Sequence, residues 1–382
     1  MGGLIVRYCR ESDYLLTFNQ NNGFFLRMGK GGKDPFYNAL GPELLDISIT
    51  NYCARNCGFC YRASHVGGLH MAPEDYEAVM GQARKLGVLQ VALGGGNPNE
   101  HPEFVRILET TRRHDIVPSY TTNGQGMTTE IYEATKKYCG ALAVSWYPPY
   151  ADAREVVRQA GIHKIKTNVH FMLSLETIPE ATDLLDNESE FLEKINAVVF
   201  LNYKPVHSSR DLCLTDGPET RRFFESVKKT SACKIGFDSC MVSYLTLLDD
   251  DLERETVDFC EAGRFSAFVS EDMRFYPCSF LKDMSEGVDL GAVSLGDAWR
   301  DGAEFQKMRG RLKARGAQEH PLEACGTCSD YDFCRGGCQI FDVNRCRPGA
   351  SMAGGPAPAA GPAPAAGLGA ADGPGPDPRA AL

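Results

Sequence analysis

Three cysteines stand close together in the stretch YCARNCGFCY, where Cys53, Cys57 and Cys60 have the spacing C-x3-C-x2-C. Cysteine thiolates bind zinc and iron–sulfur clusters, and a structural zinc ion or a 4Fe–4S cluster usually takes four ligands from the protein. Three thiols on one loop therefore leave a fourth position open. If these three thiols bind a cluster, one iron is free for chemistry; a zinc knuckle or an inert group of thiols would also fit three cysteines.

A second group of cysteines lies near the end of the chain and contains the run C-x2-C-x5-C-x3-C. Its seven members are Cys260, Cys278, Cys325, Cys328, Cys334, Cys338 and Cys346. Four-cysteine spacings of this kind suit a pair of zinc sites as well as iron–sulfur clusters. The remaining cysteines outside the two groups are expected to be buried thiols, apart from Cys240, which is considered below.

The expected compartment of the protein favours metal binding by these cysteines, and its net charge argues against some classes of partner. The stretch MGGLIVRYCRESDYLL lacks the pattern of a signal peptide, and no apolar run approaches the roughly 20 residues that span a bilayer. We therefore expect a cytoplasmic protein with reduced thiols, so its 15 cysteines point to metal rather than disulfides. The net charge of −10 argues against nucleic-acid partners and against binding to a membrane surface.

Strands and helices alternate through the middle of the chain, which predicts a parallel sheet covered by helices. The expected strands are 43–50, 88–93, 116–120, 140–146, 164–175 and 197–203. The expected helices are 73–87, 102–114, 128–138, 152–161, 178–195 and 218–229. Six units fall short of the eight of a closed barrel, so we predict an α/β fold built as a partial (β/α)6 barrel. Chemistry in such folds occurs at the carboxyl ends of the strands, where the three-cysteine loop lies.

Four regions follow from these patterns. Residues 1–42 are predicted to form a β-ribbon, 43–255 the partial barrel, and 256–348 a cysteine-rich iron–sulfur domain. Residues 349–382 repeat GPAPAA and contain little that could form a core, so a disordered tail is expected there.

The three-cysteine motif, with Phe59 inside it and a predicted barrel strand before it, resembles the radical S-adenosylmethionine (SAM) superfamily. The resemblance implies a 4Fe–4S cluster on Cys53, Cys57 and Cys60, whose free iron is chelated by SAM. It also implies that the cluster cleaves SAM to a 5′-deoxyadenosyl radical, which takes a hydrogen atom from the substrate. The stretch GGGNP resembles the family's GGEP motif, with an asparagine at the acidic position. The implied cofactor-binding residues are Phe59, Gly94, Gly95, Gly96, Asn97, Thr122, Asn123 and Ser145.

The second cysteine group resembles the SPASM domain, an extension with two auxiliary 4Fe–4S clusters in enzymes that modify peptides. By this resemblance, one cluster would be held by Cys325, Cys328, Cys334 and Cys346, and the other by Cys260, Cys278 and Cys338. Two positions depart from the pattern. Met273 stands where the family usually has glycine, and Ser266 stands where some members have a further ligand. The second cluster would therefore be open at one iron, or Cys240 would complete it.

The resemblance implies an enzyme that matures a ribosomally made precursor peptide, forming a thioether, a carbon–carbon or ether crosslink, or an oxidation. A low-potential donor such as flavodoxin or ferredoxin would supply the electron. Two alternatives stay open, a radical dehydrogenase of a small molecule and a non-catalytic electron relay or peptide-binding protein. No catalytic side chain is identifiable, although Trp146, Tyr147 and Lys204 are candidates to line the substrate pocket.

Overall fold

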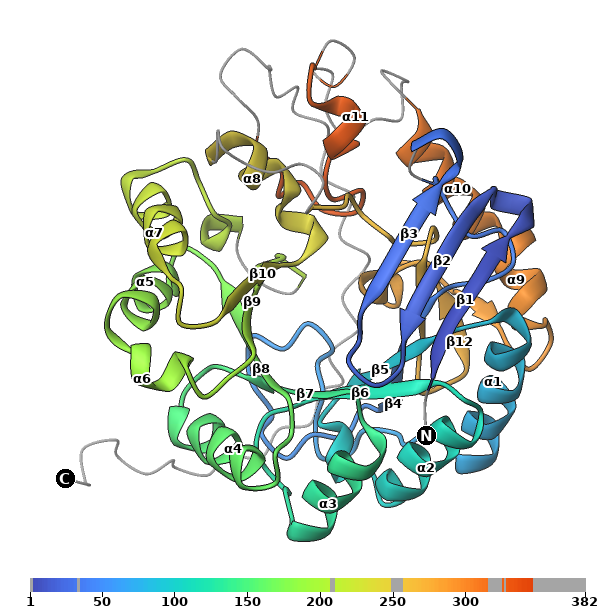
Figure 1. Cartoon of the computed structure of the whole chain (residues 1–382), viewed down its shortest axis with the longest axis horizontal. Helices are drawn as coiled ribbons and strands as arrows, with labels where there is room; N and C mark the ends of the chain where they lie inside the picture. Colours follow the sequence, from blue (N-terminus) through green and yellow to red (C-terminus); the bar gives the residue numbers. More distant parts are fainter. Residues whose placement is uncertain are drawn as a thin grey trace, which may run out of the picture.

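The computed structural model describes residues 3–32, 35–206, 210–248, 257–314, 325 and 328–345 of the 382-residue chain. Cys346 and the tail 349–382 lie outside the described residues. Within them, the strands belong to two sheets, a small antiparallel ribbon and a large, mainly parallel sheet with helices around its outer face (Figure 1).

The N-terminal ribbon contains β1 (Leu4–Cys9), β2 (Tyr14–Asn19) and β3 (Phe25–Gly29), in that order across the sheet. The predicted strands are confirmed. Alternate residues of β2 point inward, and Tyr14, Leu16 and Phe18 are completely buried. They pack against Leu89, Val117 and Phe265, so the ribbon is fixed to the large sheet by its own apolar face.

The six predicted barrel strands are all present and lie side by side in sequence order. They are β4 (Leu44–Thr50), β5 (Gln90–Gly95), β6 (Val117–Thr122), β7 (Ala141–Ser145), β8 (Thr167–Leu173) and β9 (Ala197–Asn202). Each pairs in parallel with the next. The predicted partial barrel is therefore confirmed, and the carboxyl ends of all six strands meet at one end of it.

Helices cover the outer face of this sheet (Figure 1). They are α1 (Pro73–Leu86), α2 (Phe104–Arg113), α3 (Thr129–Tyr138), α4 (Tyr150–Ile162), α5 (Ile178–Asn187), α6 (Ser189–Leu192) and α7 (Pro218–Lys229). Local signals fix their ends as predicted. Pro73 begins α1, Gly87 ends it in a left-handed conformation with φ +76°, and the Thr128 hydroxyl accepts a hydrogen bond from the Ile131 N–H at the start of α3.

The large sheet extends beyond the six predicted units at both edges. β10 (Lys234–Phe237) adds a parallel strand beside β9. On the opposite edge, β11 (Ser266–Val269) pairs in parallel with β4 and leads into β12 (Arg274–Tyr276) and β13 (Val288–Asp289). The cysteine-rich segment is therefore joined to the barrel by the sheet itself.

Beyond β10 the chain continues in further helices (Figure 1). They are α8 (Val242–Leu248), α9 (Leu295–Asp301), α10 (Ala303–Lys313) and α11 (Tyr331–Cys334). Helices α8 and α11 lie against each other. Among the helices of the described residues, none is long and apolar enough to cross a membrane.

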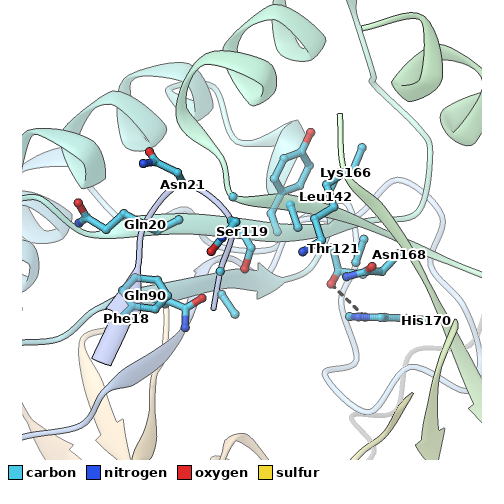
Figure 2. A pocket seen from close by; sticks show the side chains of 18 residues that line it. Phe18, Gln20, Asn21, Gln90, Ser119, Thr121, Leu142, Lys166, Asn168 and His170 are labelled. Carbon is cyan, nitrogen blue, oxygen red and sulfur yellow. Dashed lines mark hydrogen bonds between the residues drawn. The ribbon is translucent and has the colours of Figure 1, made fainter. Parts of the chain in front are cut away.

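A cavity of about 290 Å³ occupies the amino-terminal half of the barrel lumen (Figure 2). Its walls are lumen-facing residues of β5 to β8, among them Gln90, Ser119 and His170. The turn between β2 and β3 lies against its other side, and Gln20 Nε2 donates a hydrogen bond to the Asp115 carbonyl at 2.7 Å. The ribbon turn thus covers the amino end of the lumen, away from the cysteine loop that follows β4.

Candidate functional site

The three-cysteine loop lies directly after β4, at the carboxyl end of the barrel. Its backbone is held by hydrogen bonds from the Cys53 N–H to the His65 carbonyl at 3.2 Å and from the Cys60 N–H to the Cys57 carbonyl at 3.1 Å. All three thiols are free and partly exposed. Burial and the charges of Cys53 and Cys60 raise the pKa of Cys57, while Arg55 opposes this. The three sulfurs are therefore near neighbours on one loop.

Arg55 and Tyr147 support this loop from the side of β7. The Arg55 guanidinium donates to the Asn123 carbonyl at 2.9 Å and to Asp152 Oδ2 at 2.9 Å. It also lies over the Tyr147 ring, 5.0 Å from the centroid. The Tyr147 ring meets Phe59 edge-on at 5.4 Å, and Cys57 lies close enough to act on the pKa of the Tyr147 hydroxyl, which burial raises. Tyr147 thus lies beside the cysteine loop.

Trp146 points in the opposite direction from Tyr147. Its indole N–H donates to Glu180 Oε1 at 3.0 Å, and its ring packs against Tyr150 and Phe191 in the helical layer. The two neighbouring aromatics had been candidates for the same pocket, and only Tyr147 lies beside the three thiols.

The glycines after β5 allow close approaches of the backbone. A Cβ on Gly96 would lie 2.0 Å from the Tyr52 carbonyl oxygen, and one on Gly95 would lie 2.1 Å from the Thr50 carbonyl oxygen. Gly95 also has φ +106°, a conformation that favours glycine. Gly94 differs, because a Cβ there would meet nothing within 4 Å. Since Ala92 lines the lumen and side chains alternate along a strand, Gly94 faces the lumen.

A network of amides and hydroxyls connects the loop after β5 with the loop after β6. Asn97 Oδ1 accepts hydrogen bonds from the Asn123 N–H at 3.1 Å and from the Thr122 hydroxyl at 3.3 Å. Asn99 Oδ1 accepts from the same hydroxyl at 2.7 Å. Held in this way, Asn123 directs its Nδ2 to Cys53 Sγ, 3.3 Å away. Asn97 and Thr122 are buried, and their polar atoms position the Asn123 loop.

A buried ion pair joins the cysteine loop to the C-terminal segment. Glu271, just beyond β11, accepts hydrogen bonds from Arg62 at 2.9 Å and from the Ser48 hydroxyl at 2.6 Å, and it pairs with Lys282. The Arg62 and Glu271 side chains are only 2% and 3% exposed. The sequence offered no sign of this contact, because the two residues are 209 positions apart.

Four cysteines from separate segments gather beyond the ends of β9, β10 and β12. Cys240 packs in one apolar group with Cys338, and Cys260 and Cys278 lie near it. Cys338 is buried and the other three are partly buried. The predicted set of Cys260, Cys278 and Cys338 is thus brought together, with Cys240 as a fourth thiol.

Three further cysteines of the second group that the structure describes lie at or near α11. Cys325 and Cys328 pack with Tyr331, and Cys334 ends the helix. Met273 has φ +61°, the left-handed conformation that glycine adopts most readily. Met273 therefore has a left-handed backbone at the position where the SPASM pattern usually has glycine, and this conformation strains a residue with a side chain.

The donor set of the loop fits an iron–sulfur cluster, because three soft thiols lie on one loop at the open end of the barrel. The Asn123 amide already donates to one of them, and hydrogen bonds to the sulfurs of such clusters tune the reduction potential. In the described ranges, no three Cys, His, Asp or Glu side chains converge as closely as the ligands of a single metal ion do.

Comparisons with known proteins agree with this geometry. The family model of the radical SAM superfamily matches residues 47–169, which run from within β4 through the cysteine loop to the first residues of β8. "Mycofactocin maturase MftC" of Mycobacterium ulcerans is 20% identical over 313 residues, covering 78% of this chain and 83% of that protein. "Probable GTP 3′,8-cyclase" of Pyrococcus abyssi is 36% identical over 94 residues, which are 24% of this chain and 31% of that protein's length.

A solved structure extends the likeness to nearly the whole described fold. SuiB of Streptococcus suis, bound to S-adenosylmethionine, matches with a TM-score of 0.68 at 16% identity, over 88% of this chain and 94% of that one. SuiB has also been solved bound to its precursor peptide SuiA. At this identity the match establishes the fold. The family model shows that residues 47–169, with the cysteine loop, form a radical SAM domain, a family whose cofactors are a 4Fe–4S cluster and SAM.

Proposed function

We propose that this protein is a radical SAM enzyme that abstracts a hydrogen atom from a peptide, and that it matures a ribosomally made precursor. The observation that carries the proposal is the three-thiol loop at the open carboxyl end of the barrel, in a chain that also gathers Cys240 with three thiols of the C-terminal segment. When bound, the cluster and SAM supply the 5′-deoxyadenosyl radical. The chain's own residues orient the cofactor, hold the substrate and exclude water.

We assign Cys53, Cys57 and Cys60 to the cluster and the lumen-facing Gly94 to the SAM contact. Gly95, Gly96, Phe59 and Ser145 lie at the same end of the barrel and complete the proposed cofactor site. Contacts of Asn97, Thr122 and Asn123 with SAM stay predictions. Their described bonds hold the loop whose Asn123 amide donates to Cys53.

We further propose two auxiliary 4Fe–4S clusters, one on Cys325, Cys328, Cys334 and Cys346, and the other on a set that includes Cys260, Cys278 and Cys338. They would carry the electron left when the substrate radical forms its product. A flavodoxin or ferredoxin would supply the first electron. The cytoplasm suits this chemistry because its thiols stay reduced.

A peptide is favoured over a small molecule for two reasons. One relative, which this chain matches over 83% of that protein's length, is named a maturase. SuiB, which has a similar fold, has been solved bound to a precursor peptide. The ribbon turn covers the amino end of the lumen, so substrate would enter from the carboxyl end, where a long chain has room to extend. The dehydrogenase alternative would apply if only small molecules react.

The direct test incubates anaerobically reconstituted protein with SAM, a strong reductant and peptides encoded by short reading frames beside its gene. We expect 5′-deoxyadenosine to form together with a mass change in one peptide, located by tandem mass spectrometry. If 5′-deoxyadenosine forms but every candidate peptide keeps its mass, the peptide proposal fails and small-molecule substrates come first. If a fully iron-loaded protein forms none, the electron-relay alternative comes first.

The N-terminal ribbon is our proposed docking edge for the precursor. β1 pairs only with β2 among the described strands. Since the Gln20 N–H donates to the Gly3 carbonyl and bonded pairs alternate, the N–H groups of Leu4, Val6 and Tyr8 point away from β2. These three side chains are also more than half exposed. A peptide could therefore add as a further strand.

Replacing Val6 with proline is expected to weaken binding of the identified precursor at least about tenfold, because proline removes an outward N–H. The β1–β2 hydrogen bonds remain, since proline is tolerated on an edge strand with that N–H facing solvent. Binding is measured by fluorescence anisotropy with a labelled peptide. Val6→Thr serves as the control and should bind like wild type. Equal affinity of the proline variant would remove β1 from the proposal.

Changing Asn123 to leucine is expected to lower the reduction potential of the three-cysteine cluster. The amide N–H now donates to Cys53 Sγ at 3.3 Å, and such hydrogen bonds stabilise the reduced, more negative cluster. Asn123→Asp should lower the potential further, because it places a carboxylate at the sulfur. An electron paramagnetic resonance (EPR) titration measures both. A potential equal to that of wild type in the leucine variant would show that this bond does not tune the cluster.

Alanine at Gly94 and at Gly96 should have opposite effects. At Gly96 the new Cβ would lie 2.0 Å from the Tyr52 carbonyl oxygen, so the melting temperature should fall. At Gly94 the space is open, so the fold should be unaffected while SAM binding weakens by about 5- to 150-fold. Equilibrium dialysis with labelled SAM and a thermal melt separate the two. Unchanged SAM affinity in the Gly94 variant would exclude it from the cofactor site.

A further inference from the structure

Cys240 occupies a defined place at the carboxyl end of the barrel sheet. It lies in the short 3-10 turn Ser239–Met241, between β10 and α8. The turn is anchored by the Asp238 N–H, which donates to the Phe200 carbonyl at 3.0 Å, and by Asn202, whose Nδ2 donates to the Cys240 carbonyl at 3.4 Å. The position of the Cys240 thiol is therefore fixed by β9 and β10, and not by the cysteine-rich segment.

The Cys240 thiol faces three thiols that come from elsewhere in the chain. It lies beside Cys338, which stands between α11 and the end of the described residues. Cys260 and Cys278 are close enough to feel its charge. Cys240 packs in one apolar group with Cys338, and Ile340 joins that group to the one containing Cys260 and Cys278.

Groups around these sulfurs offset part of the cost of burying thiolates. The Phe341 N–H donates to Cys338 Sγ at 3.4 Å. Burial raises the pKa of Cys260 and of Cys278, and the backbone N–H groups of Ala262 and Phe280 oppose this rise. A buried cation is also present. The Lys204 side chain is 4% exposed, and its ammonium donates to Asp238 Oδ2 at 2.8 Å and to the Asn202 carbonyl at 2.9 Å. Its positive charge acts on Cys240, Cys278 and Cys338.

We infer that Cys240 is the fourth protein ligand of the auxiliary cluster held by Cys260, Cys278 and Cys338, with Lys204 balancing part of the cluster's negative charge. Each thiol loses its proton on binding iron. The inference depends on the auxiliary clusters of the proposed function and goes beyond them in one respect. A cluster with four cysteine ligands has no free iron, so the substrate does not bind to it through a thiolate, and the cluster acts only through electron transfer.

The test uses a background variant in which Cys53, Cys57 and Cys60 are alanine, so that only auxiliary clusters remain. The reconstituted, reduced background should contain iron and acid-labile sulfide, and cyanide should leave its EPR spectrum unchanged because no iron is open. Adding Cys240→Ala should open one iron, so that cyanide now shifts the spectrum. Cys213→Ala is the matched control, since Cys213 packs in the same apolar group as Cys240 and Cys338 and should not change the response.

Two results would overturn the inference directly. One is an EPR spectrum of the background variant that already shifts with cyanide. This measurement does not use the Cys240 variant, so it remains decisive even if that variant does not fold. The other is a Cys240→Ala spectrum that stays insensitive to cyanide. A background variant that binds no iron would also overturn the inference, because it would show that the auxiliary clusters do not form. In that case, 5′-deoxyadenosine release by the wild type would still support the proposed radical chemistry.

Discussion

A variant with alanine at Cys53, Cys57 and Cys60 is expected to release no 5′-deoxyadenosine from SAM under conditions in which the wild type does. The three cysteines are the only thiols that the loop after β4 offers to a cluster in the described residues. The C-terminal cysteines belong to other segments and gather around Cys338 and α11. Without the loop thiols no cluster would be bound where it could give an electron to SAM. The loss of 5′-deoxyadenosine release should therefore be complete.

The measurement is 5′-deoxyadenosine by liquid chromatography, with anaerobically reconstituted protein and a strong reductant. The matched control is Cys139→Ala, a change at a thiol on the outer side of the barrel between α3 and β7. It should release 5′-deoxyadenosine like wild type. Iron should fall by one cluster in the triple variant and stay constant in the control. Release by the triple variant would mean that another site cleaves SAM.

Much of the fold could be predicted because its signals are local. β4 has Leu45, Ile47 and Ile49 on its outer face, all at most 1% exposed, and the helix that follows has Pro73 at its start. Such patterns depend on residues near in sequence, so six strand–helix units were identifiable without long-range information. The three-cysteine loop was predicted for the same reason, since its ligands are within eight residues.

The parts that could not be predicted depend on pairing between distant segments. β10 is only four residues long and half exposed, so it gives no clear periodicity. β11 joins the edge of β4, and Ser266 pairs with Leu44 across more than 200 positions. Arg55, Arg62 and Glu271 read as ordinary surface charges in the sequence. Their roles appear only when the fold brings the loops after β4, β6 and β11 together.

Replacing Glu271 with glutamine is expected to destabilise the protein by about 3–5 kcal/mol, because it leaves the Arg62 guanidinium buried without a counter-charge. Asp272→Asn is the matched control. Asp272 also pairs with Lys282, at 3.4 Å, but its side chain is 45% exposed, so its loss should cost less than about 1 kcal/mol. The double change Arg62→Met and Glu271→Met should recover part of the loss, since it removes both buried charges.

The effect of pH gives a second readout of the same ion pair. Burial alone would raise the pKa of Glu271, but Arg62, Lys282 and Ser48 outweigh it and hold the pKa below its ordinary value. The carboxylate therefore contributes its full stability above the pKa of the unfolded chain, about 4.3, and loses it as the pH falls through the lower folded value. The gap in melting temperature between wild type and Glu271→Gln should thus be wide at pH 7 and should narrow below about pH 4. A constant gap would mean that Glu271 acts through packing. The absence of any gap would mean that the cysteine loop and the C-terminal segment are held together by β4–β11 pairing rather than by this ion pair.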